Sequence, residues 1–273
     1  MGVNDPSMDP SLFFYLLYPA GGLVAGILAG LLGVGGGVVI IPIMTSLFSR
    51  QGVSPACMLH LALGTSLATI LVTSASSLRA HHRAGAVRWD IVWAIAPGIV
   101  AGTLAGSRLA AGLSTGVLRV VFSFFLLYVA VQMVRPARTG RRRPLPGKIG
   151  LSAVGGLIGA LSSLVGIGGG TLSVPFLSRV GLGVHAAIGT SAAIGFPIAA
   201  AGTLGYVING WGVEGLPHGS AGFVYLPAFF GIASVSLFTA PIGARLAHRL
   251  PVSTLKRVFG LFLLGVAARM VGG

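Results

Sequence analysis

The chain has 273 residues, of which 54% are hydrophobic and only 8% are charged, and its formal net charge is +14. Soluble domains carry about a quarter charged residues, so this composition excludes an ordinary soluble protein and predicts an all-α polytopic membrane protein. The basic residues lie at the ends of apolar stretches and leave little soluble chain. A nucleic-acid partner is therefore excluded, and the charge is interpreted as topology control in a lipid bilayer.

Five apolar segments make up the first half, at about 12–32, 34–49, 57–78, 89–111 and 117–134. The tail before them contains Asp5 and Asp9 but no Lys or Arg, so it lacks the positive region of a cleaved signal peptide. We therefore expect the first segment to be a retained helix. Three of its four glycines, Gly22, Gly26 and Gly30, recur at every fourth position, which suits close helix packing in lipid.

A polar, basic stretch with three prolines, residues 135–148, separates these segments from five more, at about 150–166, 168–180, 185–208, 221–244 and 257–271. We interpret this stretch as a linker between an N-terminal transmembrane repeat, 1–134, and a C-terminal one, 149–273. A single cysteine, Cys57, excludes an intramolecular disulfide.

The two halves are copies of one another. Residues 26–42 read GILAGLLGVGGGVVIIP and residues 159–175 read GALSSLVGIGGGTLSVP, an offset of 133. The pattern His-x-x-x-Gly-Thr-Ser then recurs at an offset of 125, and a Gly-x-Arg-Leu-Ala block recurs at an offset of 137. The offset changes only between matched blocks, as expected when loops vary in length and helices are kept.

The distribution of basic residues discriminates between two topologies. If each glycine cluster is a sharp reversal, 14 Lys and Arg residues share one side of the membrane and four lie on the other; if the cluster continues a helix, the division is 10 to 8. The positive-inside rule favours the reversal. We therefore expect an inverted repeat of eight or more transmembrane helices with glycine-broken or re-entrant segments. In that topology the protein lies in the cell inner membrane with the basic linker cytoplasmic and both termini outside.

The glycine clusters are the strongest candidates for a binding site: Gly33, Gly35, Gly36, Gly37, Gly166, Gly168, Gly169 and Gly170. Backbone that leaves the helical pattern at membrane depth must be buried in protein or line a cavity. A helix that restarts there directs free N–H groups and a positive dipole end toward that cavity, which predicts an anion site. The alternative, in which the glycines only permit tight helix packing, is less favoured because the clusters are matched. The spacing is not that of a nucleotide-binding loop.

Matched polar residues extend the candidate site. Thr65, Ser66, Thr190 and Ser191 carry hydroxyls that either donate to an oxyanion or bond back to helix carbonyls. His60 and His185 either exchange a proton during transport or are interfacial residues bonded to water or a carbonyl. Arg108 and Arg245 either attract anions to a vestibule or anchor loops.

Carboxylates are informative because they are scarce. The four, Asp5, Asp9, Asp90 and Glu214, lie in the tail or at helix ends. A cation transporter normally needs acids within the bundle, so an anionic substrate fits better. No nucleophile with a base and no metal-ligand set is present, so we predict no enzyme, no cofactor and no metal site.

The glycine clusters with Pro42 and Pro175, the Gly-Thr-Ser elements and the arginine-containing helix blocks resemble the TauE/SafE family of sulfite and organosulfonate exporters. The resemblance covers nearly the whole chain, in two copies in the same order. It implies a secondary transporter of small sulfur-containing anions. An anion channel and a transporter of a non-sulfur organic anion stay open as alternatives. A homo-oligomer is compatible with the glycine ridges, which serve packing within one chain or between chains.

Overall fold

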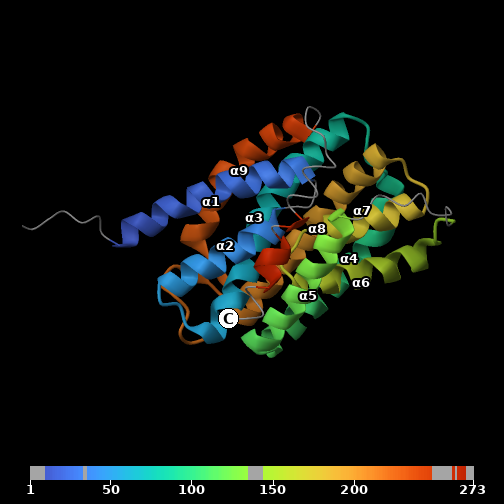
Figure 1. The fold of residues 1–273 in the computed structure, drawn as a ribbon. Helices are drawn as coiled ribbons and strands as arrows, with labels where there is room; N and C mark the ends of the chain where they lie inside the picture. The colour runs from blue at the N-terminus through green and yellow to red at the C-terminus, as the bar shows by residue number, and fades with distance from the viewer. Residues whose placement is uncertain (1–9, 33–35, 135–143, 248–259, 262, 269–273) are drawn as a thin grey trace, which may run out of the picture.

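The structure is a computed structural model, and it describes residues 10–32, 36–134, 144–247, 260–261 and 263–268. This part of the chain is almost entirely helical (Figure 1). Its labelled elements are α1 (Pro10–Leu32), α2 (Gly37–Arg50), α3 (Pro55–Arg83), α4 (Trp89–Gly112), α5 (Thr115–Val134), α6 (Lys148–Leu164), α7 (Gly170–Arg179), α8 (Val184–Gly210), β1 (Ser220–Ala221), β2 (Val224–Tyr225) and α9 (Leu226–Ala247).

Five of the described helices, α3, α4, α5, α8 and α9, are long and apolar enough to cross a membrane. A bilayer core about 30 Å thick needs about 20 helical residues, which these helices supply or approach. Shorter apolar helices are found at Leu16–Leu28, Gly37–Arg50 and Lys148–Leu164. The fold is therefore that of a multi-pass, helical membrane protein.

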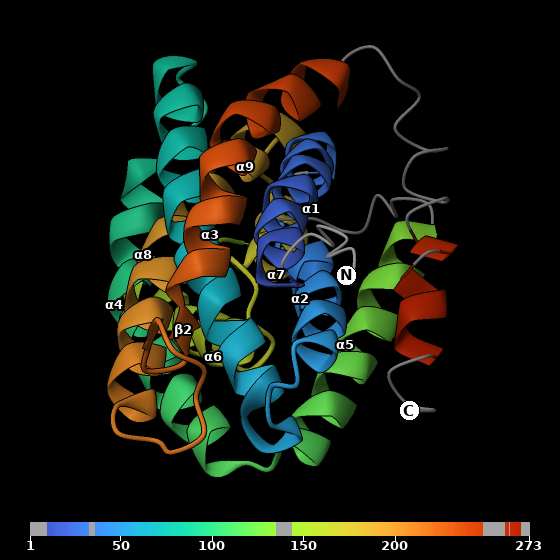
Figure 2. The same ribbon diagram turned by 90° about the vertical axis from the view of Figure 1, so that its left-hand side faces the viewer.

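Two matched helices, α3 and α8 (both labelled in Figure 2), are the most buried of the candidate spans and form the centre of the bundle. Two glycine contacts show that they run antiparallel. Near the start of α3, a Cβ on Gly64 would lie 3.0 Å from the side chain of Tyr206, close to the end of α8. Near the start of α8, a Cβ on Gly189 would lie 2.6 Å from the carbonyl oxygen of Ala86, just after α3. Glycine at both positions lets the two backbones approach closely.

The outer helices pack in two pairs, and each pair takes one helix from each half of the sequence. α1 lies along α9, where a Cβ on Gly22 would come within 2.6 Å of the Ile232 carbonyl oxygen. α6 lies along α4, where Gly102 meets the backbone of Gly156. In each pair the first helix of one half contacts the fourth helix of the other half, and the two helices run parallel.

The chain reverses direction between α1 and α2. The Tyr18 hydroxyl in α1 donates a hydrogen bond of 2.9 Å to Oε1 of Gln51, which follows the last residue of α2. The end of α2 therefore lies beside the first part of α1. A return also occurs in the second half, because α6 runs parallel to α4 while α8 begins beside Arg88, at the start of α4. The short helix α7 therefore returns the chain to the end of the bundle at which α4 and α6 begin.

This path divides the described basic residues between the two ends of the bundle. We call the end that holds Arg79, Arg83, Arg88, Lys148 and Arg179 the basic face, and the end that holds Arg50, Arg108 and Arg119 the opposite face. A hydrogen bond from the Thr115 hydroxyl to the Ala56 carbonyl joins the starts of α5 and α3 at the opposite face.

Candidate functional site

The first glycine break leads into α2. Gly33 and Gly35 lie outside the described residues, whereas Gly36 and Gly37 are placed. Gly36 has φ +36° and its carbonyl accepts the N–H groups of Val39 and Ile40, each at 3.0 Å. The N–H groups of Gly37 and Val38 stand at the start of the helix, where no preceding turn supplies an acceptor.

The second break joins α6 to α7 and is described in full. Gly166 and Gly169 have φ of +63° and +76°, a left-handed conformation that glycine adopts without steric cost. The Gly169 carbonyl accepts the N–H groups of Leu172 and Ser173, so α7 starts cleanly at Gly170. Gly166, Gly168, Gly169 and Gly170 are all buried.

The two breaks meet in the interior of the bundle. A Cβ on Gly37 would lie 2.6 Å from the carbonyl oxygen of Gly166, and the Ser66 hydroxyl donates a 2.8 Å hydrogen bond to that same oxygen. Ile70, one turn further along α3, lies against both Gly37 and Gly168. Segments about 130 residues apart in the sequence are thus in direct contact.

The matched threonines hold helix starts in place. Thr65 donates to the Leu61 carbonyl at 2.7 Å and accepts the backbone N–H of Tyr225 at 2.9 Å, just before α9. Thr190 accepts the backbone N–H of Arg88 at 3.1 Å, just before α4. Their geometry is that of residues that join the two halves. It does not direct either hydroxyl toward an open space.

Three hydroxyl residues outside the shared motifs, Ser162, Thr171 and Ser173, gather around the second break together with Ser191 of the Gly-Thr-Ser element. Ser191 shares a 2.6 Å hydrogen bond with Ser173, which in turn donates to the Gly169 carbonyl at 2.8 Å. Ser162 and Thr171 are at least nine-tenths buried, and no partner for either hydroxyl is found among the described residues. The Ser162 oxygen lies 3.5 Å from where a Cβ on Gly169 would stand.

A signal for these hydroxyls is present in the repeat itself. At the offset of 133, Ser162, Ser163, Thr171 and Ser173 correspond to Ala29, Gly30, Val38 and Ile40. The second copy thus has hydroxyl residues where the first has apolar residues or glycine. The positions at which the copies differ, and not only those that they share, therefore point to the polar surroundings of the second break.

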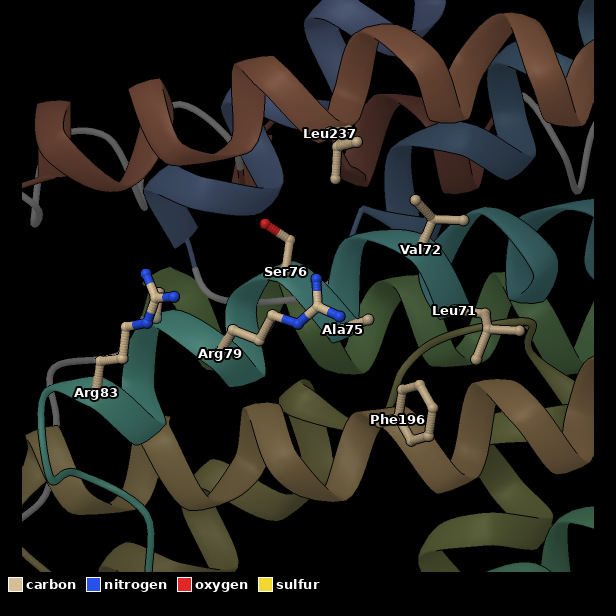
Figure 3. A pocket seen from close by; sticks show the side chains of 9 residues that line it. Leu71, Val72, Ala75, Ser76, Arg79, Arg83, Phe196 and Leu237 are labelled. Atoms are coloured by element: carbon tan, nitrogen blue, oxygen red, sulfur yellow. The ribbon is translucent and has the colours of Figure 1, made fainter.

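A cavity of about 770 Å³ opens beside α3 toward the basic face (Figure 3). Its described lining consists of Leu71, Val72, Ala75, Ser76, Arg79, Ala80, Arg83, Phe196 and Leu237. Figure 3 shows Ser76 and Val72 rising from α3 toward Leu237 of α9, with Phe196 of α8 on the other side. Leu71, at the inner end of this lining, follows Ile70 in α3, but Ile70 itself, which touches both glycine breaks, is buried and does not line the cavity.

The two matched histidines occupy different surroundings. His60 is buried near the opposite face, with Nε2 3.1 Å from the carbonyl oxygens of both Ala110 and Leu113, and its ring stacks on Phe223. His185 is exposed in the first turn of α8, at the basic face. The structure does not bring them together.

The charged side chains that the structure describes among these candidates lie at the surface. Arg108 is exposed at the opposite face, and its guanidinium donates a 3.3 Å hydrogen bond to Asn209. The side chain of Arg245 lies outside what the structure describes. Asp90 forms an exposed ion pair of 2.6 Å with Arg88, and Glu214 is exposed in the loop before β1. Of the carboxylates that the structure describes, neither enters the bundle interior.

A helical bundle of apolar spans, with two glycine breaks meeting inside it and a basic cavity open at one face, is the architecture of a multi-pass membrane protein and is compatible with the transporter class. The sulfite exporter TauE/SafE family matches residues 18–270, and the chain belongs to this family of membrane transporters.

Relatives of similar length support the same class. A probable membrane transporter protein of Haemophilus influenzae is 39% identical over 94% of this chain and 98% of its own length. Another from Methanocaldococcus jannaschii is 27% identical over 89% of this chain and 92% of its own length, and one from Xylella fastidiosa is 30% identical over 92% of both. No solved structure gives a significant match to the chain.

Proposed function

We propose that the protein is a secondary transporter that moves small sulfur-containing anions, such as sulfite, across the inner membrane by alternating access. The anion is held where the two glycine breaks meet. The observation that carries the proposal is this meeting point, with Gly37 against the Gly166 carbonyl and Ile70 in contact with both breaks. Substrate and ion sites built from broken helices near the membrane centre are typical of transporters made from internal repeats.

The chemistry around the breaks favours an anion. The starts of α2 and α7 present N–H groups without helical acceptors, and the positive ends of both helix dipoles lie at the breaks. Ser162 near the end of α6 and Thr171 at the start of α7 add hydroxyl donors for which the described residues supply no partner. A cation would find no carboxylate there, at least among the residues that the structure describes. The family description names sulfite, an oxyanion whose oxygens accept such hydrogen bonds.

We further propose that the halves form an inverted repeat that rocks about the α3–α8 centre. The antiparallel course of these matched helices supports this, as does the exchange of outer pairs, α1 with α9 and α6 with α4. The cavity at the basic face then corresponds to one of two access states. The positive-inside rule makes the basic face cytoplasmic, with the linker on that side and the N-terminus outside.

The test is uptake of radiolabelled sulfite by proteoliposomes, compared with sulfate, chloride and a small sulfonate, with and without an imposed pH gradient. Saturable sulfite movement that chloride does not share is expected. Rapid, non-saturating movement of every anion would establish the channel instead. Transport of a carboxylate but not of sulfite would show that the substrate is a non-sulfur organic anion. An effect of the pH gradient would identify proton coupling.

A further inference from the structure

Two arginines one helical turn apart line the cavity at the basic face, and no carboxylate stands beside them among the described residues. Arg79 and Arg83 are exposed on the last turns of α3, and Ser76 lies one turn further in. The described lining of the cavity contains no carboxylate, and no ion pair engages either arginine within the part of the chain that the structure describes. By contrast, Arg88 on the same face is paired with Asp90.

We propose that Arg79, Arg83 and Ser76 form an anion-capture subsite on the basic face, separate from the glycine breaks. As a step in transport this subsite rests on the function proposed above, but anion binding at the arginines does not. Its ligand is a small oxyanion that keeps part of its hydration shell.

The shape of the cavity supports capture of a hydrated ion. A water molecule takes up about 30 Å³ in the liquid, so a cavity of about 770 Å³ holds an oxyanion together with several waters. The remaining walls are mostly apolar, with Leu71, Val72, Phe196 and Leu237 among them. Low-dielectric walls around charges of one sign focus the electrostatic potential and raise the local concentration of counter-ions. Binding is therefore expected to be electrostatic and sensitive to salt.

The subsite belongs to one face only. At the offset of 125 that relates α3 to α8, Ser76, Arg79 and Arg83 correspond to Ala201, Leu204 and Ile208. All three polar lining residues are thus replaced by apolar ones in the other half. Leu71 and Phe196, which are themselves a matched pair, both line this cavity and are apolar in both copies. The inference is that anions are gathered at the basic face and not at the opposite face.

The experiment uses the variant C57A/S76C, whose only cysteine lies in the cavity, reconstituted in phosphatidylcholine nanodiscs. Its rates of modification by an anionic and a cationic methanethiosulfonate are measured. We expect the anionic reagent to be favoured, and the ratio of rates to fall about tenfold or more when R79Q and R83Q are added. Sulfate at constant ionic strength is expected to slow modification by the anionic reagent; sulfate is used because sulfite would cleave the mixed disulfide.

The control is R88Q in the same background, which removes a charge of the basic face outside the cavity and is expected to leave the ratio unchanged. An equal loss of preference in R88Q would overturn the subsite in favour of a general surface potential. No preference in C57A/S76C itself, or no protection by sulfate, would also overturn it. Loss of preference in phosphatidylglycerol nanodiscs would show that lipid phosphates, not free anions, occupy the arginines.

A flux measurement separates this inference from the proposed function. In proteoliposomes, R79Q/R83Q is expected to raise the KM for sulfite presented at the basic face several-fold and to leave the KM at the opposite face unchanged. If no sulfite moves at all while the charge preference persists, the subsite stands and the proposed function fails. If sulfite moves with equal KM in both proteins, the subsite has no part in transport.

Discussion

The hydroxyl of Ser66 in the first half of the chain donates a hydrogen bond to the carbonyl oxygen of Gly166 in the second half, at 2.8 Å. Ser66 is fully buried, and the oxygen it contacts belongs to a residue in the left-handed conformation at a helix break. One side chain thus ties the central helix α3 to the break before α7.

Replacing Ser66 by alanine removes this tie and leaves the Gly166 carbonyl with one donor fewer in a buried setting. We expect S66A to lower the free energy of unfolding by about 1–3 kcal/mol, the penalty for an unsatisfied buried polar group. Thermal denaturation in detergent measures the effect. S234A, which removes an exposed hydroxyl bonded within its own helix, is the control. Equal stability of the two variants would mean that the bond contributes nothing.

An alanine at Gly37 places a methyl group 2.6 Å from the Gly166 oxygen and 3.0 Å from the Ser66 oxygen. Because backbone atoms must move to relieve this overlap, we expect G37A to destabilise the protein by roughly 1–3 kcal/mol and to abolish most sulfite uptake. G116A is the matched control, since a Cβ there meets no atom closer than 3.9 Å. Normal uptake by G37A would show that the breaks do not need to approach one another.

Substitutions at Ser162 and Thr171 test anion binding independently of protein stability. Their hydroxyls have no described partner, so S162A and T171V are expected to leave stability unchanged or slightly higher. If these groups donate to the anion, KM for sulfite rises about tenfold or more, the range for hydrogen bonds to a charged group. S123A is the control, because Ser123 is also buried and unpartnered among the described residues but lies in α5. An unchanged KM in both variants would remove them from the anion site.

Substitutions at Thr65 and Thr190 are expected to change stability and not anion binding. Each accepts the N–H of the residue before the fourth helix of the other half, and both are completely buried. T65V and T190V are expected to lower the melting temperature while KM for sulfite stays within about twofold, because the bond they lose is structural. A large rise in KM without loss of stability would return these threonines to the binding site.

His60 and His185 test proton coupling. H60N is expected to lower stability, because Nε2 of the buried ring lies 3.1 Å from two carbonyl oxygens, and H185N is expected to be neutral because that ring is exposed. The measurement is the response of sulfite uptake to a pH gradient. If both variants lost that response while remaining folded, the matched histidines would be the coupling groups after all.

The sequence was most informative where it was duplicated. The repeat located both helix breaks and the helices around them, because a glycine-rich interruption of an apolar segment at membrane depth must be buried in protein or line a cavity. The role of the Gly-Thr-Ser element was not predictable in the same way. Thr65 acts on Tyr225, 160 residues away, and that contact depends on the packing of α3 against α9.

The cavity illustrates a second limit. In the sequence, Arg79 and Arg83 indicate only topology, and nothing local distinguishes them from Arg179, whereas Arg88 has Asp90 two residues further on. The cavity depends on Phe196 and Leu237, which come from two other helices and complete its lining. The short hairpin of Ser220–Ala221 and Val224–Tyr225 was not predictable either, because the apolar run at 221–244 gave no sign that its first residues pair as strands.

The cross-half pairing of outer helices means that sequence repeats and folding units do not coincide. Each half presents its first helix to a partner that the other half supplies, so neither half on its own buries the glycine ridges of α1 or α6. A chain cut within the linker should therefore yield two fragments that are inert separately and assemble when made together. The arrangement resembles a domain-swapped dimer in which the two subunits have been joined into one chain.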